Sequence, residues 1–287
     1  MNRKICLITG ATSGIGKAAA FALARKNYEL ILIARNEEKA KKVCFEISKK
    51  TRNDHVNKFI CDLSLLRNVR RVADKIKDAY DGIDVMINNA GAKILRHQLT
   101  DEGIELTLAT NYLGHFVLTL SLLDRMKKSQ SARIVNVSSG AHFGSRGVIE
   151  NILRAELYDG RKQYADSKLA NVLFTYALAD KLKGKSVAVN AVDPGGVATN
   201  FSRNNGLWHW LKHRLYYLKK RQLLTPEQGA ATLVFLASAN DVAGITGKYF
   251  SDLKETKSSD ISYDKALQDK IWEFSARVCG VDLEVNV

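Results

Sequence analysis

The chain has 287 residues, 46% of them hydrophobic and 26% charged, a composition that suits an ordinary globular protein with a sizeable core. Its 44 Lys and Arg residues against 30 Asp and Glu residues give a net charge of +14. The basic residues are scattered and form no block of five or more like charges, which argues against a dedicated nucleic-acid-binding tail. A solvated, lysine-rich surface is the simpler interpretation, and attraction to an anionic membrane or a phosphorylated cofactor stays open.

The four cysteines, Cys6, Cys44, Cys61 and Cys279, lack the C-x-x-C spacing of metal ligands, and we expect no metal site. Two of them fall inside predicted strands, where a free Cys is a small hydrophobe, and this fits a reducing compartment. The chain enters a strand after four residues, which leaves no room for a signal peptide. No apolar run reaches the ~18 residues of a membrane span. We therefore expect a cytoplasmic protein, although removal of an N-terminal targeting segment stays open.

Apolar runs alternate with helical stretches along almost the whole chain. The runs predicted as strands are 5–9, 30–34, 56–61, 85–88, 133–138 and 186–192. Helical stretches between strands imply right-handed βαβ crossovers, and therefore a mostly parallel sheet with helices on both faces. This is the doubly wound α/β (Rossmann) fold. Neither proline, Pro194 or Pro226, interrupts a predicted element, and the sequence has no linker or repeat, so we expect one domain over 1–287.

The first predicted strand runs into a glycine-rich turn, which reads Thr9-Gly10-Ala11-Thr12-Ser13-Gly14-Ile15-Gly16. Glycines allow the backbone to approach a pyrophosphate, and the helix that begins near Gly14 points its positive N-terminus at the phosphates. Three glycines alone are weak evidence, because many turns need glycine for positive φ. Their place after the first strand favours a dinucleotide-binding site.

The end of the second strand discriminates between the two nicotinamide dinucleotides. NAD-binding chains usually have Asp or Glu there to bind the ribose hydroxyls, but this chain reads Ile33-Ala34-Arg35-Asn36. The guanidinium of Arg35 suits the 2′-phosphate of NADP. The alternative is a solvated loop arginine, but the missing acid argues against NAD independently. NADP, or its reduced form NADPH, is therefore the predicted cofactor.

Tyr164 and Lys168 form a Y-x-x-x-K pair, which on a helix shares one face, one turn apart. A free tyrosine has a pKa near ~10, too high for a base at neutral pH, and a nearby ammonium lowers that pKa by stabilising the phenolate. The spacing alone is common by chance and usually marks a surface helix. Here it opens a predicted helix, 164–182, after a strand that ends in Ser138-Ser139, and this context favours a catalytic pair.

Taken together, the motifs resemble the short-chain dehydrogenase/reductase family over nearly the whole chain. They occur in the family's order: the glycine turn at 9–16, Asp62 in CDLS, Asn88-Asn89-Ala90-Gly91, Asn111, Ser139, Tyr164 with Lys168, and Pro194-Gly195. Joint occurrence by chance is negligible. The resemblance implies the doubly wound fold and an NADP-dependent oxidoreductase that interconverts an alcohol and its aldehyde or ketone.

The subgroup that the chain resembles most is the retinol dehydrogenase-like enzymes. The segments that carry this similarity are NYLGHF (111–116), RIVNVSS (133–139), SKLANVLF (167–174) and GKYFSD (247–252). The long interval between Ser139 and Tyr164 is also typical of the subgroup. Two features depart from it: many members have an N-terminal membrane helix, and many read His-Pro-Gly where this chain has Asp193-Pro194-Gly195. The second departure alters the nicotinamide pocket but keeps the Pro-Gly turn.

The resemblance also implies a role for each matching residue. Ser139 would polarise the substrate carbonyl, and Tyr164 would exchange a proton with that oxygen. Lys168 would lower the pKa of Tyr164 and hold the nicotinamide ribose, while Asn111 would anchor a water relay to Lys168. Asp62 would contact the adenine, and 88–91 would support the ribose. The implied cofactor contacts are Gly10, Thr12, Ser13, Gly14, Ile15, Gly16, Arg35, Asn36, Asp62, Leu63, Asn88, Ala90, Gly91, Tyr164, Lys168, Pro194, Gly195, Val197 and Thr199.

The segment 201–224 has leucines at helical spacing, with Trp208 beside them and a basic flank. In the family this region closes over the substrate, so we expect a flap that lines a pocket for a lipophilic carbonyl or alcohol. A helix packed on the core is the alternative. The basic flank leaves peripheral contact with an anionic membrane open, and homo-oligomerisation is equally open. Thr225 is expected to cap the helix that starts at Pro226.

Two other functions compete with the enzyme hypothesis. A non-catalytic NADPH-binding sensor or scaffold would keep the cofactor motifs and lose the catalytic residues, but Asn111, Ser139, Tyr164 and Lys168 are all present. A nucleic-acid-binding protein rests only on the charge of +14, and we expect no nucleic-acid partner.

Overall fold

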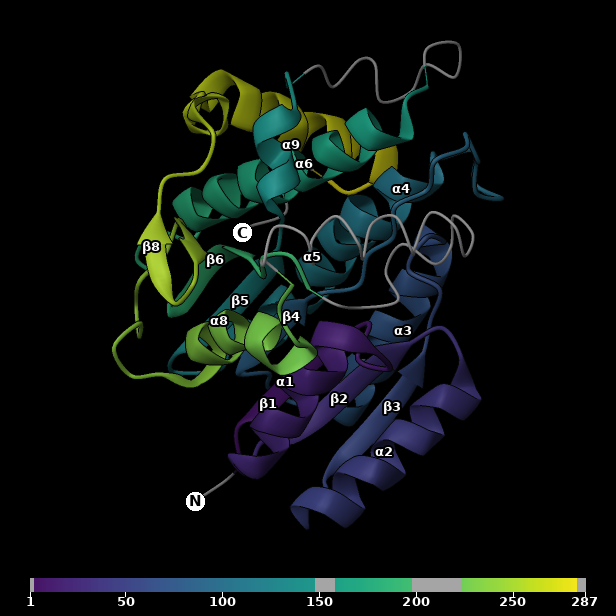
Figure 1. Ribbon diagram of the computed structural model, residues 1–287, viewed down its shortest axis with the longest axis vertical. Helices are drawn as coiled ribbons and strands as arrows, with labels where there is room; N and C mark the ends of the chain where they lie inside the picture. The colour runs from purple at the N-terminus through teal and green to yellow at the C-terminus, as the bar shows by residue number, and fades with distance from the viewer. Residues whose placement is uncertain (1–2, 148–157, 198–222, 283–287) are drawn as a thin grey trace.

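The computed structural model describes residues 3–147, 158–197 and 223–282, which form a layered α/β structure (Figure 1). Its strands are β1 (Ile5–Thr9), β2 (Glu29–Ala34), β3 (Val56–Ile60), β4 (Val85–Asn88), β5 (Ala132–Val137), β6 (Val187–Asp193), β7 (Lys248–Ser251) and β8 (Lys254–Thr256). Its helices are α1 (Gly14–Arg25), α2 (Glu37–Thr51), α3 (Leu66–Ala79), α4 (Leu106–Leu108), α5 (Gly114–Lys127), α6 (Gly160–Lys181), α8 (Pro226–Ser238) and α9 (Lys265–Cys279). A π-helical turn η1 (Ala109–Leu113) and two 3₁₀ turns, η2 (Gly140–Gly144) and η6 (Asp260–Tyr263), complete the described elements.

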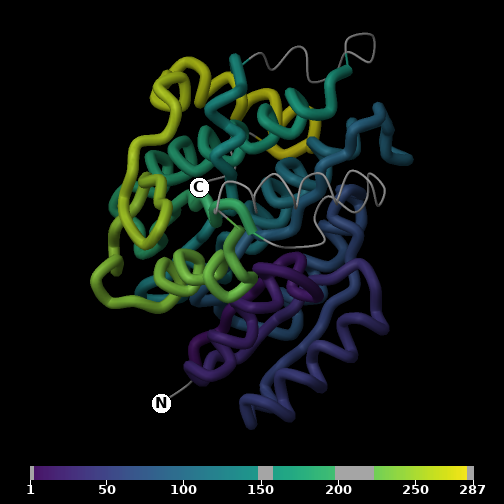
Figure 2. Tube along the Cα trace, viewed as in Figure 1, coloured from purple at the N-terminus to yellow at the C-terminus, as the bar shows by residue number. Residues whose placement is uncertain are grey.

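The strands form one sheet in the order β3-β2-β1-β4-β5-β6-β7-β8. All neighbouring pairs are parallel except β7 and β8, which form an antiparallel edge. The chain first builds outward from β1 to β3, then returns to β4 and builds in the other direction (Figure 2). The strand order therefore reverses between β1 and β4, and such a switch point is where doubly wound sheets bind ligands. The predicted doubly wound fold is confirmed.

Two hydrophobic cores hold the helices to the opposite faces of this sheet. Buried side chains of α3, α5, α6 and α9 pack on one face, and those of α1, α2 and α8 pack on the other (Figure 1). On the first face, the rings of Phe116, Phe174 and Trp272 lie 5.3–6.0 Å apart between centroids, which joins α5, α6 and α9. Burial on both faces explains why the central strands are continuous apolar runs rather than alternating patterns.

Helix boundaries differ from the sequence expectation where a polar side chain caps the helix. Helix α6 begins at Gly160, not at Tyr164, because the carboxylate of Asp159 accepts hydrogen bonds from the first backbone amides of the helix. The expected cap at Thr225 is confirmed: its hydroxyl accepts from the Gln228 amide, and the Gln228 side chain accepts from the Thr225 amide. Strand β3 ends at Ile60, so Cys61 lies just after the observed strand and not inside it, as was predicted from the run 56–61.

Among the residues that the structure describes, one helical stretch is apolar enough to cross a membrane by length and composition. It is Leu106–Lys127, with a mean hydropathy of 1.3, and 78% of this window is buried inside the protein. Its apolar character was missed in the sequence, because Thr, Asn and His residues interrupt it. Its burial is that of a core helix, since α5 contributes much of the first hydrophobic core.

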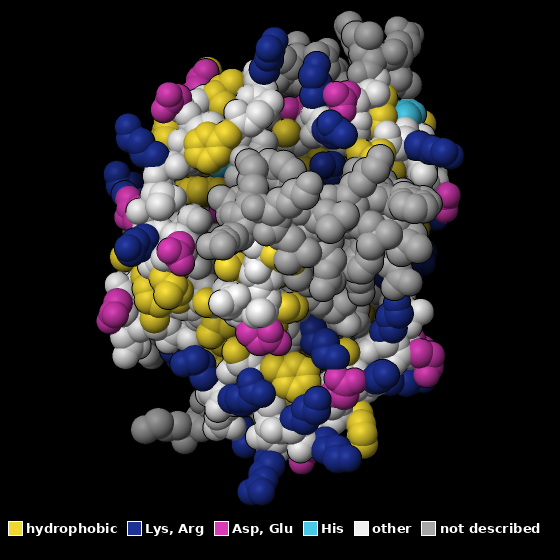
Figure 3. All heavy atoms as spheres, viewed as in Figure 1, with side chains coloured by type: hydrophobic (Ala, Val, Ile, Leu, Met, Phe, Trp, Pro, Cys, Tyr) yellow, Lys and Arg dark blue, Asp and Glu magenta, His cyan; other side chains and the backbone are white. Residues whose placement is uncertain are grey.

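Basic side chains are spread over the face shown in Figure 3, with acidic side chains among them. On this face they do not gather into one large patch. This distribution agrees with a solvated basic surface as the source of the charge of +14.

Candidate active site

A cavity of about 1630 Å³ lies at the carboxyl ends of the parallel strands. It exceeds the ~300–1,000 Å³ of most small-molecule sites, and so has room for an extended dinucleotide with a substrate. Many of the residues singled out in the sequence line this cavity: Gly10, Thr12, Ser13, Gly14, Ile15, Gly16, Arg35, Asn36, Asp62, Leu63, Ala90, Gly91, Ser139, Tyr164, Lys168, Pro194, Gly195 and Val197.

The glycine turn fits closely against the loop that follows β4. A Cβ on Gly16 would lie 2.4 Å from Asn89 Nδ2, and Gly10 has a φ of +68° that favours glycine. Asn89 Nδ2 donates to the carbonyl of Thr9, and the hydroxyl of Thr9 accepts from the amides of Asn89 and Ala90. These bonds fix the turn at the switch point of the sheet.

The N-terminus of α1 has no competing acceptor of its own. Ser13 stands at the N-cap position without a side-chain capping bond, and the first turn has no acidic residue. The backbone amides of a helix N-terminus attract phosphate groups through their unpaired N–H donors and the helix dipole. A turn that only a glycine backbone can form, followed by an uncapped helix, fits the pyrophosphate of a nicotinamide dinucleotide.

The end of β2 supplies cations to the same cavity. Arg35, Asn36 and Lys39 line it, and the Asn36 side chain also caps α2 by accepting from the Lys39 amide. Lys39 was missed in the sequence, because its distance from the strand end gives no signal until the helix turn brings it back. After the neighbouring strand β3, Asp62 Oδ1 accepts from both the amide and the hydroxyl of Ser64, which fixes the Asp62 carboxylate.

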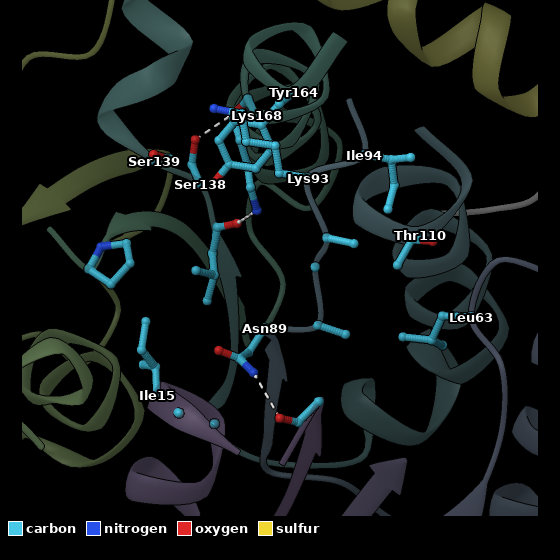
Figure 4. A pocket seen from close by; sticks show the side chains of 18 of the residues that line it. Ile15, Leu63, Asn89, Lys93, Ile94, Thr110, Ser138, Ser139, Tyr164 and Lys168 are labelled. Atoms are coloured by element: carbon cyan, nitrogen blue, oxygen red, sulfur yellow. Dashed lines mark hydrogen bonds between the residues drawn. The ribbon is translucent and has the colours of Figure 1, made fainter. Parts of the chain in front are cut away.

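Tyr164 and Lys168 lie one turn apart on the cavity side of α6 (Figure 4). The Lys168 ammonium is 5.8 Å from the centroid of the Tyr164 ring, and it donates to the carbonyl oxygen of Val137 at 2.9 Å. Burial lowers the pKa of Lys168 to about 8, and the negative charge of Asp193 opposes that shift. Lys168 is thus a buried cation whose charged form depends on nearby acceptors and acids.

Ser138 and Ser139 follow β5 and make different contacts. The hydroxyl of Ser138 is buried and donates to the backbone carbonyl of Lys168 at 2.8 Å. The hydroxyl of Ser139 accepts from the Ala141 amide at 3.2 Å and lines the cavity. Ser138 therefore ties α6 to β5, while Ser139 keeps a hydroxyl proton to donate into the cavity (Figure 4).

Asn88 and Asn111 lie outside the cavity lining, and the expected cofactor contact at Asn88 stays a prediction. Asn88 Nδ2 donates to Thr119 and Asn136, so its side chain crosslinks β4, α5 and β5, and Asn89 lines the cavity instead. The reason is that successive side chains leave a strand end in opposite directions.

The side chain of Asn111 holds the backbone of a neighbouring loop. Its Oδ1 accepts from the Ala92 amide, and its Nδ2 donates to the Ala92 carbonyl and to Ser167 Oγ. It is fully buried in η1, and its own carbonyl oxygen lies 3.1 Å from His115 Nδ1. All these bonds of the Asn111 side-chain amide go to protein partners. A water relay from Asn111 to Lys168 would therefore have to use the backbone carbonyl of Asn111.

Some predicted residues lie outside the described part of the chain. These are Thr199 and the expected flap up to residue 222, including Trp208. Conversely, the cavity is also lined by residues that no sequence motif indicated, among them Lys93, Ile94, Arg96, Thr110, Arg161 and Lys162. For Arg161 alone the sequence contains a usable signal. It precedes Tyr164 by three positions, and on a helix this spacing places both residues on the same face.

The sequence matches the profile of the short chain dehydrogenase family over residues 4–210. The chain belongs to this family. It is 36% identical to human retinol dehydrogenase 13 over 97% of this chain and 85% of that protein, and 37% identical to human polyprenol dehydrogenase over 97% and 86%. Among solved structures, a short chain dehydrogenase from Shigella flexneri complexed with NADP has a TM-score of 0.67 and 26% identity, over 88% of this chain and 98% of that one.

Membership in the short chain dehydrogenase family accounts for the cavity as a nicotinamide dinucleotide site. The family consists of oxidoreductases that interconvert alcohols and carbonyl compounds, and this chain groups with its retinol dehydrogenase-like members. The described residues contain no cluster of His, Cys, Asp or Glu that could hold a metal ion.

Proposed function

We propose that this chain is an NADP-dependent oxidoreductase that interconverts a lipophilic alcohol and its aldehyde or ketone, with Tyr164 as the proton donor and acceptor. The observation that carries this proposal is the meeting of Tyr164, Lys168 and Ser139 in one cavity with the glycine turn and Arg35. A protein that only senses NADPH would need the glycine turn and Arg35, but not a buried lysine beside a tyrosine.

Arg35 and Lys39 support NADP as the cofactor. Both cations line the cavity at the end of β2, and no acidic residue of the described chain lines it there. A guanidinium and an ammonium at this point would bind a 2′-phosphate, and neither can accept hydrogen bonds from the ribose hydroxyls as a carboxylate does. The Shigella flexneri relative was solved with NADP, which agrees with this choice.

The protein side chains supply the proton chemistry. The bound nicotinamide would give or take the hydride. In reduction, Ser139 would donate a hydrogen bond to the substrate carbonyl, and Tyr164 would donate its phenolic proton to the same oxygen. The Lys168 ammonium would stabilise the resulting phenolate, as a neighbouring positive charge favours the ionised form of tyrosine. Oxidation would reverse each of these steps.

The lipophilic substrate class rests on the relatives and on the sequence of the expected flap. Two similar proteins are named for retinol and for polyprenol, both long apolar alcohols. The segment 201–224 is rich in Leu, Trp and Tyr, as a segment covering an apolar substrate would be.

We also propose that the chain acts as a single domain in a reducing, cytoplasmic compartment. The single-domain proposal is supported by one continuous sheet from β3 to β8. The reducing compartment is supported by the four cysteines, all of which are free thiols.

The test of this function is NADPH consumption by the purified full chain with a panel of aldehydes and ketones. We expect turnover with medium-length and long apolar aldehydes, and a lower kcat/KM with NADH than with NADPH. Binding of NADPH without turnover of any carbonyl compound, or of any alcohol with NADP, would favour the sensor hypothesis.

A further inference from the structure

Four cations line the wall of the cavity around Tyr164. They are Lys93 and Arg96, from the loop after β4, and Arg161 and Lys162, from the first turn of α6. Arg161, Tyr164 and Lys168 occupy positions i, i+3 and i+7 of α6, so one helix face carries the guanidinium, the phenol and the buried ammonium in sequence. Lys93 Nζ is 5.5 Å from the centroid of the Tyr164 ring, and Figure 4 shows Lys93 beside that ring.

The loop that carries Lys93 is held firmly against α6. Gly160 packs so closely that a Cβ on it would lie 2.3 Å from the carbonyl oxygen of Ile94. The hydroxyl of Tyr158 donates to that same carbonyl at 2.8 Å. This packing keeps the backbone segments that carry Lys93 and Arg161 next to each other.

The pKa of Lys93 is lowered by its surroundings. Burial lowers the pKa of Lys93, and the positive charge of Arg161 lowers that pKa further. Asp159 opposes the shift, but this exposed carboxylate caps α6 by accepting from the amides of Arg161 and Lys162. Two like charges beside a cavity are an unfavourable arrangement that an anion in the cavity would relieve.

Two acids of the described chain that lie on or close to α6 are hydrogen-bonded to internal partners. Glu105 is buried, and its carboxylate accepts from two backbone amides, the Gln163 side chain and the Tyr158 hydroxyl. Asp166 accepts from the hydroxyl of Ser145. The two acids of the described chain that do line the cavity, Asp62 and Asp193, belong to the ends of β3 and β6.

We infer that this wall binds an anionic group of the substrate, so that the physiological substrate is an aldehyde or ketone that carries a carboxylate or a phosphate on its apolar chain. The inference rests on the proposed function and narrows its substrate class from neutral lipids to acidic amphipathic ones. A guanidinium and an ammonium on adjacent segments can bind both oxygens of such a group. Asp193, which also lines the cavity, would repel the same group.

The experiment compares kcat/KM with NADPH for an ω-oxo fatty acid and for its methyl ester of equal length. We expect the wild-type protein to favour the acid by about tenfold or more, the size of one charge-assisted hydrogen bond. Rising salt should shrink the preference, because screening weakens a partly exposed charge pair. An aldehyde phosphate and the corresponding hydroxy aldehyde form a second pair, which tells whether phosphate or carboxylate is the better anion.

Variants of Arg161 locate the preference. Arg161→Gln should reduce the acid-over-ester ratio about tenfold, Arg161→Lys should retain part of it, and Arg161→Glu should favour the ester. Arg71→Gln, an exposed arginine on α3 away from the cavity, is the matched control and should leave the ratio unchanged. The affinity for NADPH and the thermal melting temperature of each variant report whether the cofactor site and the fold are intact.

Three outcomes would overturn the inference, and they show whether the proposed function fails with it. Equal kcat/KM for acid and ester in the wild-type protein, or an unchanged ratio in Arg161→Gln, would contradict the anion site and leave the proposed oxidoreductase function standing. No turnover of any aldehyde would remove the proposed function and this inference together.

Discussion

The ring of His142 connects Ser139, the proposed catalytic serine, to the C-terminal part of the chain. Its Nδ1 lies 2.7 Å from the carbonyl oxygen of Ser139, and its Nε2 accepts from the amide of Ser259 at 3.0 Å. Because Nε2 is an acceptor, Nδ1 carries the proton and donates it to Ser139. Burial lowers the pKa of His142, which keeps the ring in this neutral form. A segment before β6 and a segment after β8 are thereby fixed to each other.

This contact predicts a positioning role for His142. His142→Phe keeps an aromatic ring but loses both hydrogen bonds, and we expect kcat to fall about tenfold while NADPH affinity changes little. His142→Asn, whose amide can still donate toward Ser139, should recover part of kcat. Steady-state kinetics and NADPH titration of both variants check this, with His55→Phe as an exposed control. An unchanged kcat in His142→Phe would show that Ser139 needs no support from the ring.

Lys168 should destabilise the cofactor-free protein at neutral pH. Its pKa is lowered to about 8 in the folded chain, against 10.5 for an unhindered lysine. Below pH 8 both the folded and the unfolded chain bind this proton, and the folded chain bears the full cost of a buried cation. Between pH 8 and 10.5 only the unfolded chain keeps the proton, so this cost decreases as the pH rises.

Lys168→Met should therefore abolish turnover and yet raise the free energy of unfolding at pH 7, by on the order of 3 kcal/mol at most. The gain over wild type should shrink between pH 8 and 10.5. Urea unfolding at several pH values measures it, and Lys181→Met, at the exposed far end of α6, is the control. A less stable Lys168→Met protein would mean that the Lys168 to Val137 hydrogen bond outweighs the cost of desolvation.

Cofactor choice should depend on Arg35. The wild-type protein should bind NADPH more tightly than NADH, and Arg35→Asp should reverse the ratio of the two affinities, since a carboxylate repels the 2′-phosphate and binds ribose hydroxyls. Loss of one charge-assisted contact corresponds to about a tenfold or greater weakening of NADPH binding. Fluorescence titration with both cofactors measures the ratio. Equal affinities in the wild-type protein would refute this assignment.

The sequence predicted the sheet and the cofactor end of the cavity well, because both depend on local features. Continuous apolar runs marked the parallel strands, and the glycine turn needs only its own backbone geometry to approach a phosphate. The start of α6 was wrong by one turn, because the capping role of Asp159 was not considered. Asn89, and not Asn88, lines the cavity, because successive side chains leave the end of β4 in opposite directions, and the motif alone does not say which one faces the cavity.

The cations around Tyr164 could not be predicted from sequence spacing. Lys93 and Arg161 are distant in the chain and meet only because Gly160 packs on the backbone of Ile94. In the sequence they belong to a scattered excess of basic residues, which is the pattern of a solvated surface. Such contacts between distant segments depend on tertiary packing, which the spacing of residues along the sequence does not reveal.

The most direct test of the account is the replacement Tyr164→Phe in the full chain. The ring would still pack against Lys93 and Lys168, but the proton that reduction requires would be gone. We predict that NADPH binds Tyr164→Phe nearly as tightly as wild type, and that turnover of every aldehyde falls by ~10²–10⁴-fold, the usual contribution of a positioned acid or base. Turnover above about a tenth of the wild-type rate would contradict the role of Tyr164 and with it the proposed mechanism.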